Sequence, residues 1–154
     1  DSSKRCRCTS DAIERYRGKL SGPLLDRIDI HLAMTRLSHE ELHLNAPLGE
    51  ASSAIRERVM AARQRQIVRQ GVCNSHLSQA DLKAYCQLTS SDQTLLDKAM
   101  TALQLSARAT YRILRVARTI ADLADCEHIE TKHLAEAIQY RQLDRALAVP
   151  KRRN

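Results

Sequence analysis

The chain has 154 residues, which is enough for one ordinary domain or for part of a larger protein. Apolar residues make up 43% of it, but Phe and Trp are absent and Gly and Pro are scarce, which excludes a turn-rich all-β fold. The net charge of +7 favours a polyanionic partner such as nucleic acid or nucleotide phosphate, with a basic, solvated surface as the alternative. The five cysteines are scattered, and no signal peptide or apolar run of membrane-spanning length is present, so we expect a cytoplasmic protein without membrane contact.

The first elements expected along the chain are a short helix over residues 10–19 and one strand over residues 28–34. In the strand segment, "IDIHLAM", apolar side chains alternate with smaller or polar ones, which is typical of a half-buried strand. A single strand cannot satisfy its own backbone groups. We therefore expect its sheet partner to be missing from this chain or to come from a neighbouring one.

Two short patterns suggest metal binding, and neither is convincing. Residues 39–43, "HEELH", fit the H-E-x-x-H pattern of zinc proteases, but Pro47 disfavours a stable helix there and no third ligand is evident. We expect solvated side chains on a loop. Cys6 and Cys8 supply half of a four-ligand zinc site at most, or are two ordinary thiols. We therefore predict no metal site within this chain.

From about residue 50 onward the pattern predicts a mainly α structure, a helical bundle. The helix expected over 53–70 ends at Gly71, and later starts are marked by Ser78 with Asp81, by Ser90 with Gln93, and by Ser106. The remaining helices are expected over residues 78–88, 90–103, 106–125 and 130–144, followed by a basic tail at 149–154.

Long stretches of the chain resemble the magnesium-chelatase-like AAA+ ATPases, in the ComM/YifB branch. The stretch "YRGKLSGPLLDRIDIHL" at 16–32 carries the resemblance most distinctly. It continues in "GEASSAIRERVMAARQRQ" at 49–66, "LSARATYRILRVARTIADL" at 105–123 and "HLAEAIQYRQLDR" at 133–145. These segments match the family's linker helix, lid helix and closing helix.

The resemblance implies that the chain is the C-terminal portion of such an ATPase. Residues 1–45 would be the last strand and helix edge of the α/β core, and residues 46–148 the helical lid. No P-loop pattern is present, since Gly18 and Lys19 are followed by Leu20. We expect a cytoplasmic homo-hexamer that uses ATP and Mg²⁺ in its full-length form, whereas the present chain alone would neither hydrolyse ATP nor bind it well.

Two arginines correspond to nucleotide-contacting positions of the family. Arg27 matches the arginine finger, which reaches the γ-phosphate held by the neighbouring subunit, and Arg108 matches sensor 2, which contacts the nucleotide of its own subunit. At helical spacing Arg112 and Arg115 share the face of Arg108 and are weaker candidates for nucleotide contact. From the residues alone, Arg27 could instead pair with a neighbouring aspartate, and the arginine face could be solvated with local pairs such as Arg118 with Asp122.

The ComM-like branch implies a DNA motor, active in branch migration or unwinding during recombination or natural transformation. Arg56 and Arg63 on the 53–70 helix could contact the DNA backbone, although solvated or intersubunit charge is an equally good interpretation. The alternative functions are an ATPase subunit of a chelatase-type metal-insertion complex, a protein-remodelling ATPase, and a non-enzymatic helical module that binds DNA or protein.

Overall fold

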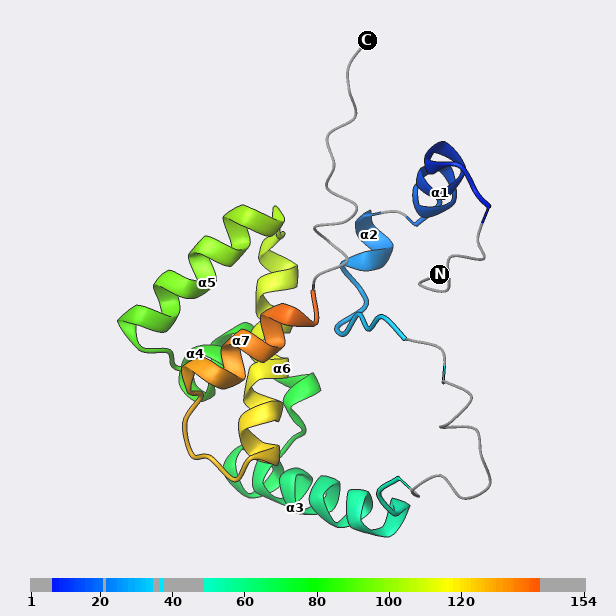
Figure 1. The fold of residues 1–154 in the computed structure, drawn as a ribbon. Coiled ribbons are helices and arrows are strands. Elements are labelled where there is room, and N and C mark those ends of the chain that lie inside the picture. Colours follow the sequence, from blue (N-terminus) through cyan, green and yellow to red (C-terminus); the bar gives the residue numbers. More distant parts are fainter. Residues whose placement is uncertain (1–6, 21, 35–36, 38–48, 142–154) are drawn as a thin grey trace.

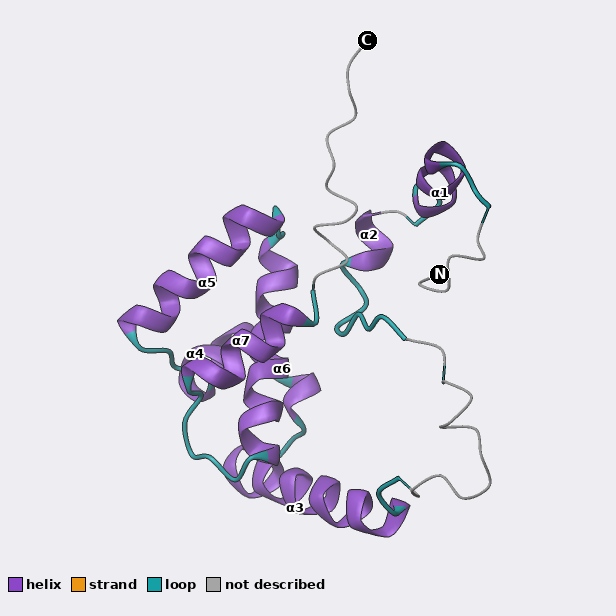
Figure 2. Ribbon diagram, in the orientation of Figure 1, coloured by secondary structure: helices purple, strands orange, loops and turns teal. Residues whose placement is uncertain are grey.

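The computed structural model describes residues 7–20, 22–34, 37 and 49–141, and within these residues the fold contains helices and no strand (Figures 1 and 2). The prediction of a mainly α structure is confirmed. The elements in chain order are α1 (Ser10–Arg17), α2 (Gly22–Leu25), α3 (Ser52–Gln70), the 3-10 turn η1 (Asn74–His76), α4 (Gln79–Tyr85), α5 (Ser90–Leu103), α6 (Ala107–Leu123) and α7 (Thr131–Gln139).

Helix α6 lies at the centre of the bundle and packs against α3, η1, α4 and α7, while α5 packs against α7 (Figure 1). Its face of small and branched residues carries the core, with Ile113, Ala117 and Ala121 all essentially inaccessible to solvent. Small side chains let the neighbouring helices approach closely, which is how a core without Phe or Trp reaches close packing. The other core residues are Leu77, Leu82, Cys86, Leu96, Ile129, Leu134 and Ala137.

Most helix ends follow the signals in the sequence. Ser78 and Asp81 form the predicted capping box of α4, the Ser106 hydroxyl accepts the N–H of Ala109 at the start of α6, and Gly71 ends α3 in the left-handed region at φ 76°. The predicted bounds of α5, 90–103, are confirmed, but its predicted cap is wrong. Thr89, not Ser90, is the cap, because its hydroxyl accepts the N–H of Asp92.

The predicted strand over residues 28–34 is wrong. The segment has no sheet partner among the described residues, and the N–H of His31 instead donates to the carbonyl of Tyr140 at 2.8 Å. Its apolar side chains remain exposed, with Ile30 at 46% and Met34 at 88%. Ile30 and Leu32 line an open groove beside Val116 and Ile120 of α6, which covers them only in part.

Several sequence patterns cannot be placed. The histidines at 39–43, Cys6 and the basic tail lie outside the described residues, and the proposed boundary between residues 45 and 46 stays a prediction. No helix in the described part of the chain is both long and apolar enough to cross a bilayer.

A buried carboxylate, that of Asp122, connects α3, η1 and α6. Asp122 is 1% exposed and accepts hydrogen bonds from Arg69 at 2.6 Å, Asn74 at 2.8 Å and Arg118 at 3.2 Å. Burial opposes the charge of Asp122, but the hydrogen bonds from Arg69 and Asn74 and the charge of Arg118 outweigh it and hold its pKa below the usual value. The three elements are therefore joined through one ionised side chain.

We predict that Asp122→Ala lowers the free energy of unfolding by about 3 to 5 kcal/mol, because it leaves the buried guanidinium of Arg118 without its carboxylate. Urea denaturation at pH 7 measures the change. The matched control is Asp97→Ala, which removes an exposed carboxylate on α5 and should change stability by less than about 0.5 kcal/mol. Equal effects of the two substitutions would contradict this role for Asp122.

The same carboxylate gives stability a defined pH dependence. Since the folded-state pKa of Asp122 is depressed, its contribution is complete above the unfolded-state pKa of about 4 and is lost as the pH falls through the folded-state pKa. The free energy of unfolding, measured by denaturation at pH 7 and pH 3, should therefore fall more between these pH values for the unmodified chain than for Asp122→Ala.

Candidate functional site

The segment around Arg27 forms a tight turn on the surface of the helical bundle. We call residues 24–29 the Arg27 turn. The N–H of Arg27 donates to the carbonyl of Leu24 and that of Ile28 to the carbonyl of Leu25, each at 3.0 Å. The side chain of Leu25 is buried and anchors the turn. The turn begins in the last residues of α2, so the helix end and the buried Leu25 together fix the position of the Arg27 backbone.

Two side chains of α6 hold the Arg27 turn from one side. The hydroxyl of Ser106 donates to the carboxylate of Asp26 at 2.9 Å. The guanidinium of Arg112 donates to the carbonyl of Arg27 itself at 2.7 Å and forms an ion pair with Asp29. The turn is therefore attached to the first half of the central helix.

Arg141, which follows α7, holds the same turn from beneath. Its side chain is completely buried and donates hydrogen bonds to the carbonyls of Leu25 and Ile28. Its guanidinium also lies 3.8 Å from the carboxylate of Asp26. A buried guanidinium needs several acceptors, and the backbone of the turn supplies two of them, both to the Nη1 nitrogen.

The side chain of Arg27, in contrast, projects into solvent. It is exposed, donates one hydrogen bond to the carbonyl of Pro23 at 3.3 Å, and forms no ion pair within the described residues. Pairing with Asp26 or Asp29, the alternative that the sequence left open, does not occur because other groups bind these carboxylates. A fixed backbone with a free guanidinium is suited to contacting an anion outside the chain.

Arg108 is the second residue of α6 and is also exposed, with no hydrogen bond or ion pair in the described part of the chain. The first turn of α6 contains no acidic residue. A cation near a helix N-terminus faces the positive end of the helix dipole, which is unfavourable by about 0.3 to 1 kcal/mol. An anion bound here would be attracted by both the guanidinium and the helix end.

The other arginines of α6 are engaged within the chain. Arg112 contacts the Arg27 turn, as described above, and Arg115 donates to the carbonyl of Leu77. Their contact with nucleotide stays a prediction. Arg118 and Asp122 form the expected local pair, but they are buried rather than part of a solvated face.

The arginines of α3 also divide into two groups. Arg58 pairs with Glu50 and Arg65 with Asp125. Arg56 and Arg63 are exposed and have no hydrogen bond or ion pair with described residues. They are therefore available to an outside partner, and their predicted contact with DNA stays a prediction.

The described residues contain one cluster with the composition of a metal site, formed by Cys126, Glu130 and His133, whose potential ligand atoms lie within 4.8 Å of one another. Two of its three groups already have partners within the chain, whereas the buried Nε2 atom of His133 has no hydrogen-bond partner among the described residues. The Nδ1 atom of His133 accepts the N–H of Glu130 at 3.1 Å, which caps α7, and Lys132 pairs with the Glu130 carboxylate at 2.8 Å. Burial is the main cause that lowers the pKa of His133. We assign this cluster to the cap of α7.

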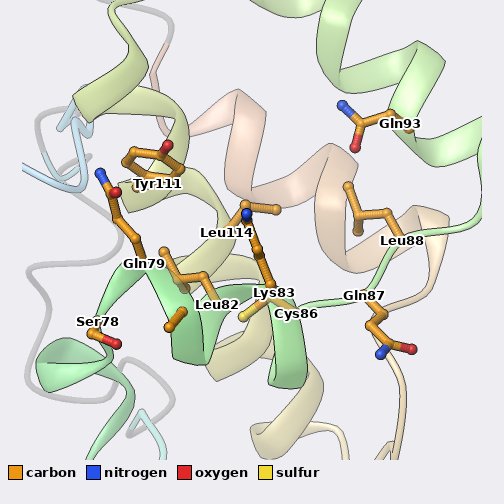
Figure 3. A pocket seen from close by; sticks show the side chains of 11 residues that line it. Ser78, Gln79, Leu82, Lys83, Cys86, Gln87, Leu88, Gln93, Tyr111 and Leu114 are labelled. Carbon is orange, nitrogen blue, oxygen red and sulfur yellow. The ribbon is translucent and has the colours of Figure 1, made fainter.

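A groove of about 860 Å³ opens between α4, α5 and α6 (Figure 3). Its walls are largely apolar, and Figure 3 shows the thiol of Cys86 beside Leu82 and Leu114, with Gln87 and Gln93 at the rim. Burial is the main cause that raises the pKa of Cys86 to about 11, although three nearby arginines oppose the shift. The thiol is protonated at neutral pH and is unsuited to act as a nucleophile.

Comparison with known proteins gives consistent results along the chain. The family described as "Magnesium chelatase, subunit ChlI C-terminal" matches residues 49–141, and "Magnesium chelatase, subunit ChlI" matches residues 1–42. The uncharacterized protein YifB of Escherichia coli is 42% identical and the competence protein ComM of Haemophilus influenzae 40% identical, each over 92% of this chain. The chain spans 28% of the length of each of these relatives.

We predict that Cys86 is alkylated at least about 100 times more slowly than Cys8 by iodoacetamide at pH 8, because its thiol is buried and its pKa is raised. Mass spectrometry of the labelled native chain measures both rates, and labelling in urea provides the control in which the two rates converge. Similar rates in the native chain would contradict the described burial of the thiol.

Proposed function

Because the chain belongs to the magnesium chelatase ChlI family, we propose that it is the C-terminal part of a ring-forming AAA+ ATPase and supplies two arginines to ATP hydrolysis. Arg27 is the arginine finger, which acts on the nucleotide of the neighbouring subunit. Arg108 is sensor 2, which contacts the nucleotide of its own subunit. In the full-length protein ATP and Mg²⁺ are the cofactors, and the Mg²⁺ neutralises charge on the phosphates.

The observation that carries the proposal is the contrast between the backbone and the side chain of Arg27. Three side chains hold its turn in place, whereas its exposed guanidinium makes one hydrogen bond, to the carbonyl of Pro23, and no ion pair with the described residues. A finger needs both properties, since it must reach a phosphate without the loss of orientation that a mobile loop would cause. Arginine fingers accelerate phosphoryl transfer by about 10³ to 10⁵ in the best-studied cases.

Arg108 supports the same proposal independently. Its position, unfavourable within the chain, becomes favourable once a phosphate binds near the start of α6. In the proposed assembly this chain contributes cations to the nucleotide site.

The ring geometry makes the two roles separable. In a head-to-tail ring each nucleotide site lies between two subunits, one of which supplies Arg108 and the other Arg27. A subunit without Arg27 is defective only towards its neighbour. A subunit without Arg108 lacks this contact at its own site and still carries Arg27 for its neighbour.

We therefore expect the full-length variants Arg27→Ala and Arg108→Ala each to lose most ATP turnover, and a mixture of the two to regain part of it. Random mixing restores both arginines at about one interface in four. ATP turnover of each variant, and of the mixture after subunit exchange, measures this. Two arginines that act in the same subunit would give no recovery, and that result would overturn the assignment.

Exposed Arg56→Ala serves as the control substitution, because it removes a free guanidinium outside the proposed site. Its basal ATP turnover should match that of the unmodified protein. A loss of turnover as large as that in Arg27→Ala would mean that general charge, not the position of Arg27, determines activity.

We further propose that the ATPase acts on DNA. The relative from Haemophilus influenzae is named a competence protein, and this chain carries exposed, unengaged arginines on α3 together with a net charge of +7. The described residues offer few aromatic side chains for base stacking, so binding should be directed at phosphates and depend steeply on salt.

If α3 contacts DNA, the double variant Arg56→Ala, Arg63→Ala should bind forked DNA more weakly and reduce the slope of log affinity against log salt by about 1 to 2. Fluorescence anisotropy of full-length protein over a range of salt concentrations measures the slope. Unchanged affinity and slope would remove α3 from the DNA interface. ATP turnover indifferent to DNA would favour a chelatase-type or protein-remodelling ATPase instead.

A further inference from the structure

The two proposed nucleotide contacts are linked within one subunit through a single serine. Ser106 accepts the N–H of Ala109 and so caps α6, two residues before Arg108. The same hydroxyl donates to the carboxylate of Asp26, the residue immediately before Arg27. The start of the lid helix and the Arg27 turn are therefore joined by one hydrogen bond between residues that are 80 positions apart.

We propose that Asp26 is a positioning residue that couples the two nucleotide sites of a subunit, so that nucleotide contact by Arg108 at the subunit's own site sets the position of Arg27 in its neighbour's site. This inference rests on the proposed roles of the two arginines and adds a regulatory link between them. ATP or ADP phosphate is the ligand to which the link responds.

The contacts of the turn determine how it can move. Asp26 is attached to Ser106 at the start of α6, and Arg112 is attached to the carbonyl of Arg27 from further along the same helix. Both attachment points, Ser106 and Arg112, lie at the cap and within the first two turns of this helix. A tilt of α6 that brings Arg108 to a phosphate therefore carries the backbone of Arg27 with it.

A purely structural role for Asp26 is less consistent with these contacts. The turn is already anchored by the buried side chain of Leu25 and by the hydrogen bonds from Arg141 to two of its carbonyls. The side chain of Asp26 is 34% exposed, and its distance of 3.8 Å from Arg141 is long for a strong ion pair. Loss of Asp26 should thus leave the turn folded but release it from Ser106, with Arg112 as the remaining contact from α6.

The link has a consequence for the whole ring. The arginine finger of one subunit acts on the nucleotide site of the next. If the nucleotide bound by a subunit sets the position of that subunit's Arg27, successive nucleotide sites around the ring are coupled. Hydrolysis would then be cooperative, with a Hill coefficient above 1 for ATP turnover. Without the link, each site would respond only to its own nucleotide.

The test is Asp26→Ala in the full-length protein. We expect kcat to fall about 10- to 100-fold through misplacement of Arg27, the Hill coefficient to approach 1, and ATP affinity to stay within about twofold. The substitution Asp26→Asn keeps an oxygen that accepts from Ser106 and should retain most activity and cooperativity. Asp97→Ala is the control for removal of an exposed carboxylate, and its melting temperature should match that of Asp26→Ala within about 3 °C.

A double substitution separates positioning from stability. If Asp26 acts through Arg27, Asp26→Ala should cause no further loss of turnover in the Arg27→Ala protein. Additive losses, or cooperativity and kcat equal to those of Asp97→Ala, would overturn the coupling role. If Arg27→Ala itself leaves turnover unchanged, the proposed function fails first, so the two failures are distinguishable.

Discussion

A guanidinium has five N–H groups, and when it is buried it needs hydrogen-bond acceptors from the protein. In this bundle that need attaches two loops to the helices, although the buried Nε of Arg115 has no acceptor among the described residues. Arg118, which is 2% exposed, donates to the carbonyls of Cys126 and Glu127 and so fixes the connection between α6 and α7. Arg141 does the same for the turn at Leu25 and Ile28. In a core without Phe or Trp, these arginines fill space and also orient the loops, because hydrogen bonds are directional and aliphatic contacts are not.

The contacts of each guanidinium distinguish the arginines that stabilise the fold from those that remain available to a partner. Arg69, Arg112 and Arg118 bind carboxylates or carbonyls of the chain. Arg27 donates only to the carbonyl of Pro23, and Arg108 forms no hydrogen bond or ion pair with the described residues. Arg56 and Arg63 on α3 are equally unengaged, so exposure alone does not identify a nucleotide contact. The resemblance to the magnesium chelatase family implies that role for Arg27 and Arg108, and the proposed function rests on this implication together with the held backbone of the Arg27 turn.

Local signals in the sequence predicted much of the fold. Caps at Ser78 and Ser106 and the end at Gly71 depend on groups within four residues, which a sequence pattern contains. The contacts that define the site join residues far apart, such as Ser106 with Asp26 and Arg141 with Ile28, and no local pattern encodes them. The strand over residues 28–34 failed for a related reason. Alternation of apolar and polar residues indicates a face that can be buried. A strand also needs a neighbouring strand for its backbone hydrogen bonds, and the described residues contain none.

The central claim is that Arg27 serves a neighbouring subunit while Arg108 serves its own. The most direct measurement is a structure of the assembled full-length protein with a non-hydrolysable ATP analogue. The account predicts that the guanidinium of Arg27 lies within about 3 Å of the γ-phosphate held by the adjacent subunit, and that of Arg108 within about 3 Å of the phosphates of its own subunit. An assembly in which Arg27 faces solvent, or pairs with Asp26 or Asp29 beside a bound nucleotide, would contradict it.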